Sequence, residues 1–280
     1  MDLRGDLPAQ AAVAWQRAAR ARASAERAFR IAERYDSMSG GSADFTFKRL
    51  AGVHRTTGSR HQVAAELLEA HARRVGRWVG GPLPLFMTGV AEACGSRSVA
   101  VTLVDNDHHQ VATASSDQSS SDAQELEYVL GEGPVQDAVE ARAPVEASGA
   151  ALSGRWPGYG PALAALGIGQ VVAVPLEAPG ECIGALAVFD PPREAASTVL
   201  FSRIADALTR SVLLDGDAVA ALFSGIDYRA VVHQAAGVVA VQLDCSVDDA
   251  LEMVKARAFA DGRAIGDVAA DIVNRQLKLG

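Results

Sequence analysis

The sequence has few cysteines, few aromatic residues and no long hydrophobic run. Its three cysteines, Cys94, Cys182 and Cys245, are odd in number and far apart, which excludes a disulfide framework and a zinc site with paired ligand spacing. No stretch approaches the roughly 18 consecutive apolar residues of a membrane span, and the N-terminus lacks the apolar block of a signal peptide. We therefore expect a cytoplasmic protein that does not contact a membrane.

Short catalytic motifs are also missing. The sequence contains no phosphate-binding loop, nucleophile elbow or zinc-helix motif, and Gly131-x-Gly133 lacks the third glycine of a dinucleotide fingerprint. His54, His61 and His71 could share one helical face, but no carboxylate or cysteine accompanies them at ligand spacing, so we interpret them as histidines of a helix interface. We expect no enzyme and no metal site, and the sequence identifies no cofactor.

The 280 residues amount to about two domains, and their charge divides into three zones. Residues 1–80 contain 14 basic and 8 acidic residues, residues 81–215 contain 6 and 17, and residues 216–280 contain 6 and 9. The net charge of −8 therefore hides a basic N-terminal zone. This distribution excludes a uniformly basic nucleic-acid binder but allows a local basic face.

The first zone, residues 1–80, predicts a helical or coiled-coil region. The alanine- and arginine-rich run Ala9–Tyr35 has no internal Gly or Pro, and the Gly- and Ser-rich stretch Ser37–Ser42 follows it as a break. A second helix is expected from about Phe45 to Val79, which Gly58 could interrupt, and an apolar stripe from Leu50 to Val75 recurs at spacings of three and four. This hairpin or coiled-coil pattern predicts a homodimer.

The second zone, residues 81–215, predicts an α+β domain with an antiparallel sheet, helices on one side of the sheet and an enclosed pocket. Ser116–Asp122 is expected to be a loop, and a long helix from Arg193 to about Leu214 is expected to leave the domain. The other expected helices are Leu85–Cys94 and Pro161–Leu166, and the expected strands are Val99–Val104, Gln110–Ser115, Ala143–Glu146, Gln170–Leu176 and Cys182–Phe189.

The third zone, residues 216–280, has no strand pattern and predicts three short helices. The first is expected at Asp227–Gln242, the second begins after a capping sequence at Ser246 and runs through Ala260, and the third is expected at Ile265–Leu277. Three helices of this length form a small bundle with a modest core.

Residues 224–276 resemble an ANTAR domain, the RNA-binding module of bacterial transcription antiterminators. The resemblance is carried by Arg229–Val239, then by Ser246–Ala250, then by Val268-Ala269. It implies that the three helices bind structured leader RNA. The family usually has a lysine where Ala236 stands here, which removes one cation. The remaining RNA-binding candidates are Arg229, His233, Gln234, Lys255, Arg257, Arg263 and Arg275.

The middle zone resembles a GAF domain of the actinobacterial antiterminator type. The residues that carry this are Leu130-Gly131-Glu132-Gly133-Pro134 with Asp137-Ala138, then Arg142–Val145, then Ile183–Leu186. Related domains often have a cysteine where Val135 stands here, so thiol chemistry is excluded at that position. The resemblance implies a sensor for a small ligand, such as a cyclic nucleotide, haem or tetrapyrrole, or a domain that only dimerises.

Taken together, the sequence predicts a signal-responsive antiterminator with an N-terminal helical region, a GAF sensor and an ANTAR effector that binds leader hairpins. The alternative is a dimeric interaction or sensory scaffold without RNA binding. Clustering of the basic candidates on one face would favour RNA, whereas their dispersal would favour the scaffold.

Overall fold

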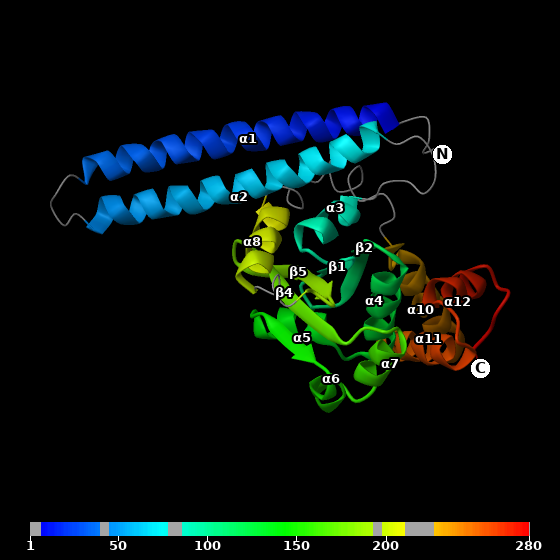
Figure 1. Ribbon diagram of the computed structural model, residues 1–280. Helices are drawn as coiled ribbons and strands as arrows, with labels where there is room; N and C mark the ends of the chain where they lie inside the picture. The colour runs from blue at the N-terminus through cyan, green and yellow to red at the C-terminus, as the bar shows by residue number, and fades with distance from the viewer. Residues whose placement is uncertain (1–6, 40–44, 78–85, 193–197, 211–226, 280) are drawn as a thin grey trace.

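A helical hairpin, called the arm below, forms the N-terminal part of the chain. The computed structural model describes residues 7–39, 45–77, 86–192, 198–210 and 227–279. In it, α1 (Leu7–Met38) and α2 (Phe45–Gly76) lie side by side over their whole length (Figure 1). The two predicted helices are therefore confirmed, although α1 continues to Met38, beyond the start of the expected break at Ser37, and residues 40–44 lie outside the described residues.

Small residues let the two arm helices approach closely. The buried residues of α1 include a series of alanines at spacings of three and four, Ala11, Ala14, Ala18, Ala21, Ala25, Ala28 and Ala32. Gly58 does not interrupt α2: a Cβ atom at this position would lie 2.8 Å from the Phe29 ring of α1. This glycine therefore makes room for an aromatic side chain, which is why it occurs inside a continuous helix.

A single antiparallel sheet forms the centre of the molecule, with strand order β3-β4-β5-β1-β2-β6. Its main strands agree with the sequence prediction, except that β3 lies two residues later than expected. The strands are β1 (Ser98–Val104), β2 (Gln110–Ser115), β3 (Val145–Ser148), β4 (Gln170–Ala178), β5 (Glu181–Phe189) and β6 (Asp227–Tyr228).

Helices cover both faces of the sheet, not one face as the sequence analysis expected (Figure 1). On one face lie α2, α3 (Phe86–Ala93) and α8 (Thr198–Leu208); on the other lie α4 (Gln118–Leu130), α5 (Pro134–Ala141), α6 (Ala150–Arg155) and α7 (Tyr159–Ala165). In β4, Val172 and Val174 pack into the first core, whereas Val171 and Ala173 pack into the second. A continuous apolar strand of this kind is typical of burial on both faces.

Helix α4 begins inside the stretch that was expected to be a loop. Asp117 is its N-cap: the Asp117 carboxylate accepts the Ser120 N–H, and the Ser120 hydroxyl accepts the Asp117 N–H. This reciprocal pair is a capping box, in which the polar residues start a helix instead of forming a loop.

The C-terminal bundle consists of α10 (Ala230–Leu243), α11 (Val247–Asp261) and α12 (Ile265–Val273), packed around one core. Two details of the prediction are wrong: β6 occupies Asp227 and Tyr228, where a helix was expected, and α12 ends at Val273, four residues early. Pairing of β6 with β2 joins the bundle to the edge of the sheet.

One bent pair of helices has the length and composition of a membrane span. Within the described residues, no single helix has the length and apolar composition of a span, but α10 and α11 together meet these two criteria across a bend of 110°. Of the expected helix Arg193–Leu214, the structure shows the part from Thr198 to Leu208, which is α8. Residues 193–197 and 211–226 lie outside the described residues.

Candidate ligand cavity between the sheet and the C-terminal bundle

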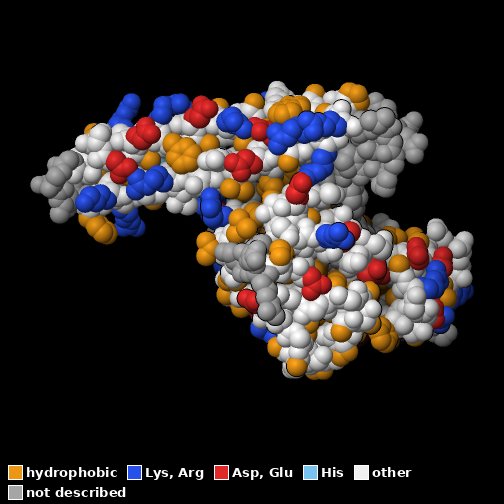
Figure 2. Space-filling view, viewed as in Figure 1, with side chains coloured by type: hydrophobic (Ala, Val, Ile, Leu, Met, Phe, Trp, Pro, Cys, Tyr) orange, Lys and Arg blue, Asp and Glu red, His pale blue; other side chains and the backbone are white. Residues whose placement is uncertain are grey.

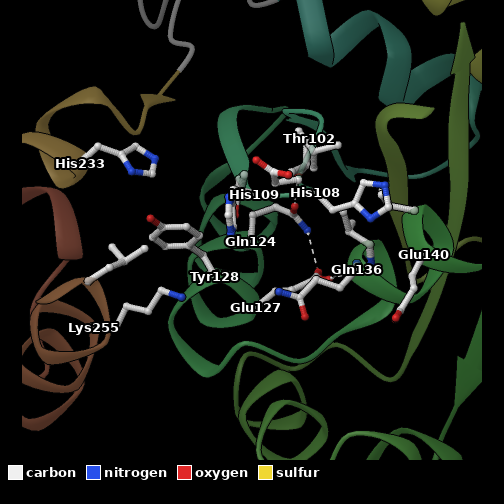
Figure 3. Close-up of a pocket in the computed structure, with 16 residues that line it drawn as sticks. Thr102, His108, His109, Gln124, Glu127, Tyr128, Gln136, Glu140, His233 and Lys255 are labelled. Carbon is white, nitrogen blue, oxygen red and sulfur yellow. Dashed lines mark hydrogen bonds between the residues drawn. The ribbon is translucent and has the colours of Figure 1, made fainter. Parts of the chain in front are cut away.

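A cavity of about 320 Å³ lies where the sheet, α4 and α5 meet the C-terminal bundle. We call it the sheet–bundle cavity. Figure 3 shows its polar side chains converging from both parts of the chain. The residues that the figure labels are Thr102, His108, His109, Gln124, Glu127, Tyr128, Gln136, Glu140, His233 and Lys255.

Glu127 of α4 is buried at the wall of this cavity and caps α5. Its Oε1 accepts the backbone N–H groups of Val135 at 2.7 Å and Gln136 at 2.9 Å. The N-cap residue of α5 is Gly133, which has no side chain to satisfy these donors. A Cβ atom at Gly133 would lie 2.5 Å from the Glu127 Cδ atom, so only glycine leaves room for the carboxyl group.

A short chain of hydrogen bonds connects Glu127 to the sheet. The Thr102 hydroxyl donates to Gln124 Oε1, and Gln124 Nε2 donates to Glu127 Oε2 at 3.5 Å (Figure 3). Burial raises the pKa of Glu127 to about 8, and the two backbone N–H groups oppose this rise. The carboxyl group is therefore largely protonated at neutral pH. Because Oε1 accepts two hydrogen bonds, Oε2 is the oxygen that can carry the proton and donate it to a ligand.

Tyr128 anchors α4 in the C-terminal bundle. Its ring lies 4.5 Å from the guanidinium carbon of Arg229 and 4.8 Å from Lys255 Nζ, so one aromatic ring holds two cations. The ring itself belongs to the core of the bundle, and the Arg229 side chain is only 2% exposed. The backbone N–H of Arg229 also donates to the Val111 carbonyl of β2 at 3.1 Å.

The structure places four of the RNA-binding candidates on the side of the bundle that faces α4. Arg229 and Lys255 contact Tyr128, and His233 and Lys255 line the sheet–bundle cavity. Arg263 lines a second cavity of about 370 Å³, together with Glu125 of α4. These candidates therefore lie on one side of the bundle, where Arg229 and Lys255 are covered by α4 whereas His233 and Arg263 remain exposed.

The other three candidates are exposed as well. Arg257 donates to Asp261 at 2.7 Å, Gln234 lies on the exposed side of α10, and Arg275 follows the end of α12. Ala236, which stands at the usual lysine position, is fully buried in the bundle core. An alanine in place of the usual lysine therefore suits this position, because the position faces the inside of the bundle.

A cluster of potential metal ligands occurs at the β1–β2 turn. The ligand atoms of Asp105, Asp107 and His109 lie within 4.8 Å of one another, and all three residues are exposed. Asp105 Oδ1 accepts the backbone N–H groups of Asp107 at 3.0 Å and His109 at 2.9 Å. Turn formation accounts for this arrangement, so we assign no metal to it.

Sequence reasoning named none of the α4 residues that build this site. Gln124 and Glu127 are three residues apart and face the cavity, whereas Glu125 and Tyr128, also three apart, contact the bundle, and the Tyr128 ring lines the cavity as well. The available signal was the capping pair at Asp117 and Ser120, which marks the start of the helix.

Comparison with known families identifies a GAF domain at residues 83–212. The match begins just before α3 and runs past the end of α8, so the predicted GAF domain is confirmed, whereas its antiterminator type stays a prediction. A GAF domain indicates a ligand-sensing or regulatory role. None of the curated proteins compared with the chain matches it. The ANTAR resemblance of the C-terminal helices stays a prediction.

Proposed function

We propose that the chain is a ligand-responsive regulator, not an enzyme, in which a small molecule in the sheet–bundle cavity controls the C-terminal bundle. One observation carries the proposal: Gln124 and Glu127 of the GAF domain line the same cavity as His233 and Lys255 of the bundle. A ligand that fits only the docked or only the undocked arrangement shifts the equilibrium between them by its difference in affinity.

The cavity has the size and chemistry of a small-ligand site. Its volume of about 320 Å³ lies at the lower end of the usual range of roughly 300 to 1,000 Å³. Gln124, Glu127 and Lys255 supply fixed polar groups, and Val135 and Val139 supply apolar surface. Because Gln124 and Glu127 alternate along α4 with the docking residues Glu125 and Tyr128, a ligand that moves one side of the helix also moves the other.

We further propose that the released bundle binds structured leader RNA and prevents transcription termination, as the ANTAR resemblance implies. Arg229 and Lys255 hold Tyr128 in the docked arrangement, and Arg263 faces α4. Phosphate groups could reach Arg229 and Lys255 only after the bundle leaves α4, whereas Arg263 is exposed and pairs with Asp271. Docking on the GAF domain and RNA binding are therefore expected to exclude each other.

Filter binding of leader hairpins to the full chain tests this proposal. Tyr128→Ala removes the ring that holds both cations, and Tyr128→Phe keeps the ring as a matched control. Each cation–π contact contributes roughly 0.5 to 2 kcal/mol, so Tyr128→Ala is expected to bind RNA about tenfold more tightly than the parent. Tyr128→Phe is expected to bind like the parent. The double variant Arg229→Ala, Arg257→Ala is expected to lose binding and to flatten the salt dependence.

The alternative is a dimeric interaction scaffold without RNA binding. It is favoured if Tyr128→Ala undocks the bundle, as shown by faster tryptic cleavage after Arg229, but still binds no hairpin in a salt-dependent manner. In that outcome the regulatory part of the proposal stands and the RNA part fails. If the cleavage rate is unchanged, the docking contact is not controlled by Tyr128 and the regulatory part fails.

A further inference from the structure

A third cavity, of about 350 Å³, lies between the arm and α8, and we call it the arm–α8 cavity. Figure 1 shows α8 against α2, on the face of the sheet opposite α5. The residues that line the cavity are Arg55, Thr56, Ser59, Arg60, Val63, Arg203 and Asp206. None of them lines the sheet–bundle cavity, so this is a separate place in the molecule.

The arm–α8 cavity is built from two matching helix faces. On α2 the lining residues recur at intervals of one and three or four residues from Arg55 to Val63, which places them on one face. On α8, Arg203 and Asp206 are three residues apart. Arg60 joins the two helices by an ion pair with Asp206. The ion pair that joins α2 to α8 therefore also forms part of the cavity wall.

Positive charge exceeds negative charge at this cavity. Asp206 is shared between Arg60 and Arg210, and Arg55 pairs with Asp36 of α1. Arg203 has no carboxylate partner among the described residues. The lining itself contains three guanidinium groups and one carboxylate, which leaves two positive charges. Figure 2 shows the wider setting, an arm surface along which Lys and Arg side chains are prominent.

A purely structural ion-pair network does not account for this composition. Arg60 and Asp206 already join α2 to α8 by an ion pair, whereas Arg203 makes no ion pair within the described residues. Guanidinium groups match the oxygens of phosphate in pairs, and their planar donors make stronger and more directional contacts than an ammonium group does. The hydroxyls of Thr56 and Ser59 border the same space and can also donate.

We propose that the arm–α8 cavity binds a dianionic phosphate group, either inorganic phosphate or the phosphate of a small monoester. The two excess positive charges match a group that carries a charge of about −1.5 to −2 at neutral pH. The cavity volume of about 350 Å³ lies in the range of small-ligand sites, so it has room for an ester substituent beside the phosphate. By bridging α2 and α8, the anion would strengthen the attachment of the arm to the GAF domain.

Calorimetric titration of the full chain with inorganic phosphate, at constant ionic strength against chloride, tests this site. The parent is expected to bind phosphate, and Arg203→Ala is expected to bind at least tenfold more weakly. Arg203 makes no ion pair within the described residues, so its replacement should leave the unfolding temperature in chloride unchanged. Arg20→Ala is the matched control, because Arg20 is an exposed arginine of α1 that does not line the cavity. It is expected to bind like the parent.

Two further probes identify the source of the phosphate. Glycerol 3-phosphate represents a soluble monoester, and vesicles that contain phosphatidic acid present the same group on a lipid surface. Binding of soluble probes alone, abolished by Arg203→Ala, assigns the site to a free metabolite, whereas Arg203-dependent vesicle binding assigns it to a lipid headgroup. The proposal is overturned if phosphate binds no better than chloride or if Arg203→Ala binds phosphate as well as the parent does.

Discussion

Glu125 of α4 accepts the backbone N–H of Ile265 at 2.6 Å, so a side chain of the GAF domain caps the last helix of the chain. The N-cap residue of α12 is Ala264, which has no capping group of its own. The contact spans 140 residues of sequence. The start of α12 therefore depends on docking of the bundle against α4.

Glu125→Ala is expected to loosen α12 without unfolding the GAF domain. Loss of an N-cap costs about 1 kcal/mol, so amide hydrogen exchange at the first turn of α12 should rise about fivefold while exchange in β4 and β5 stays the same. Glu125→Gln keeps an acceptor oxygen and should lie between the parent and the alanine variant. Equal protection of α12 in all three proteins would mean that the cap does not stabilise docking.

Two more glutamates near the end of α4 act in the same way. Glu127 caps α5, and Glu132 Oε1 accepts the N–H groups of Gly158 at 2.6 Å and Tyr159 at 2.8 Å at the start of α7. Each capped helix has a glycine or alanine as its N-cap residue. One short segment thus fixes the start of three helices.

Gly133→Ala is expected to destabilise the protein through the cap at Glu127. The new methyl group would lie 2.5 Å from Glu127 Cδ and force the buried carboxyl away from the α5 amides. We expect a loss of roughly 2 to 3 kcal/mol in the free energy of unfolding, measured in urea, because a buried polar group loses its partners. Gly154→Ala is the control: nothing lies within 4 Å of its Cβ position, and this helical substitution should be neutral or slightly stabilising.

The strands and the long helices could be predicted from the sequence because their signals are local. The apolar runs of β4 and β5 and the uninterrupted α1 carry their own periodicity or composition. The capping contacts could not be predicted in this way. Nothing near Ala264 in the sequence indicates that its helix is capped by Glu125, since the partner is set by tertiary packing. Tyr128 was missed for the same reason, because its cations come from the N-cap residue of α10 and from α11.

A homodimer that forms through the arm is the expected oligomeric state. Several large apolar side chains of the arm remain exposed although the helices pair with each other, Val13, Trp15, Ile31, Met38, Phe45 and Val53. Self-association would bury this surface. Light scattering at micromolar concentration should give twice the mass of 29.1 kDa, and the double variant Phe45→Glu, Val53→Glu should shift the protein toward monomer. A parent that is monomeric under these conditions would contradict the prediction.

Burial of Glu127 makes the stability of the protein depend on pH. In the unfolded chain its carboxyl ionises near the ordinary pKa of 4.5, whereas burial raises its pKa to about 8 in the folded protein. Between these values the folded protein holds a proton that the unfolded chain has released. The contribution of Glu127 to the free energy of unfolding therefore falls as pH rises through this window, by roughly 1.4 kcal/mol per pH unit.

Glu127→Gln is expected to remove this dependence, because the amide has the shape of the protonated acid and its oxygen can still accept the N–H groups of Val135 and Gln136. The variant loses only the 3.5 Å hydrogen bond from Gln124 Nε2, since its own amide nitrogen cannot accept it. In urea unfolding, the variant should match the parent within about 1 kcal/mol at pH 5 and exceed it by several kcal/mol at pH 8. Burial lowers the pKa of His71 to about 4, so His71 makes the protein more stable as pH rises from about 4 to 6.5. This effect is present in both proteins and cancels in their difference. A difference that stays constant from pH 5 to 8 would show that Glu127 is ionised in the folded protein, so that the sheet–bundle cavity would hold a permanent negative charge and favour a cationic ligand.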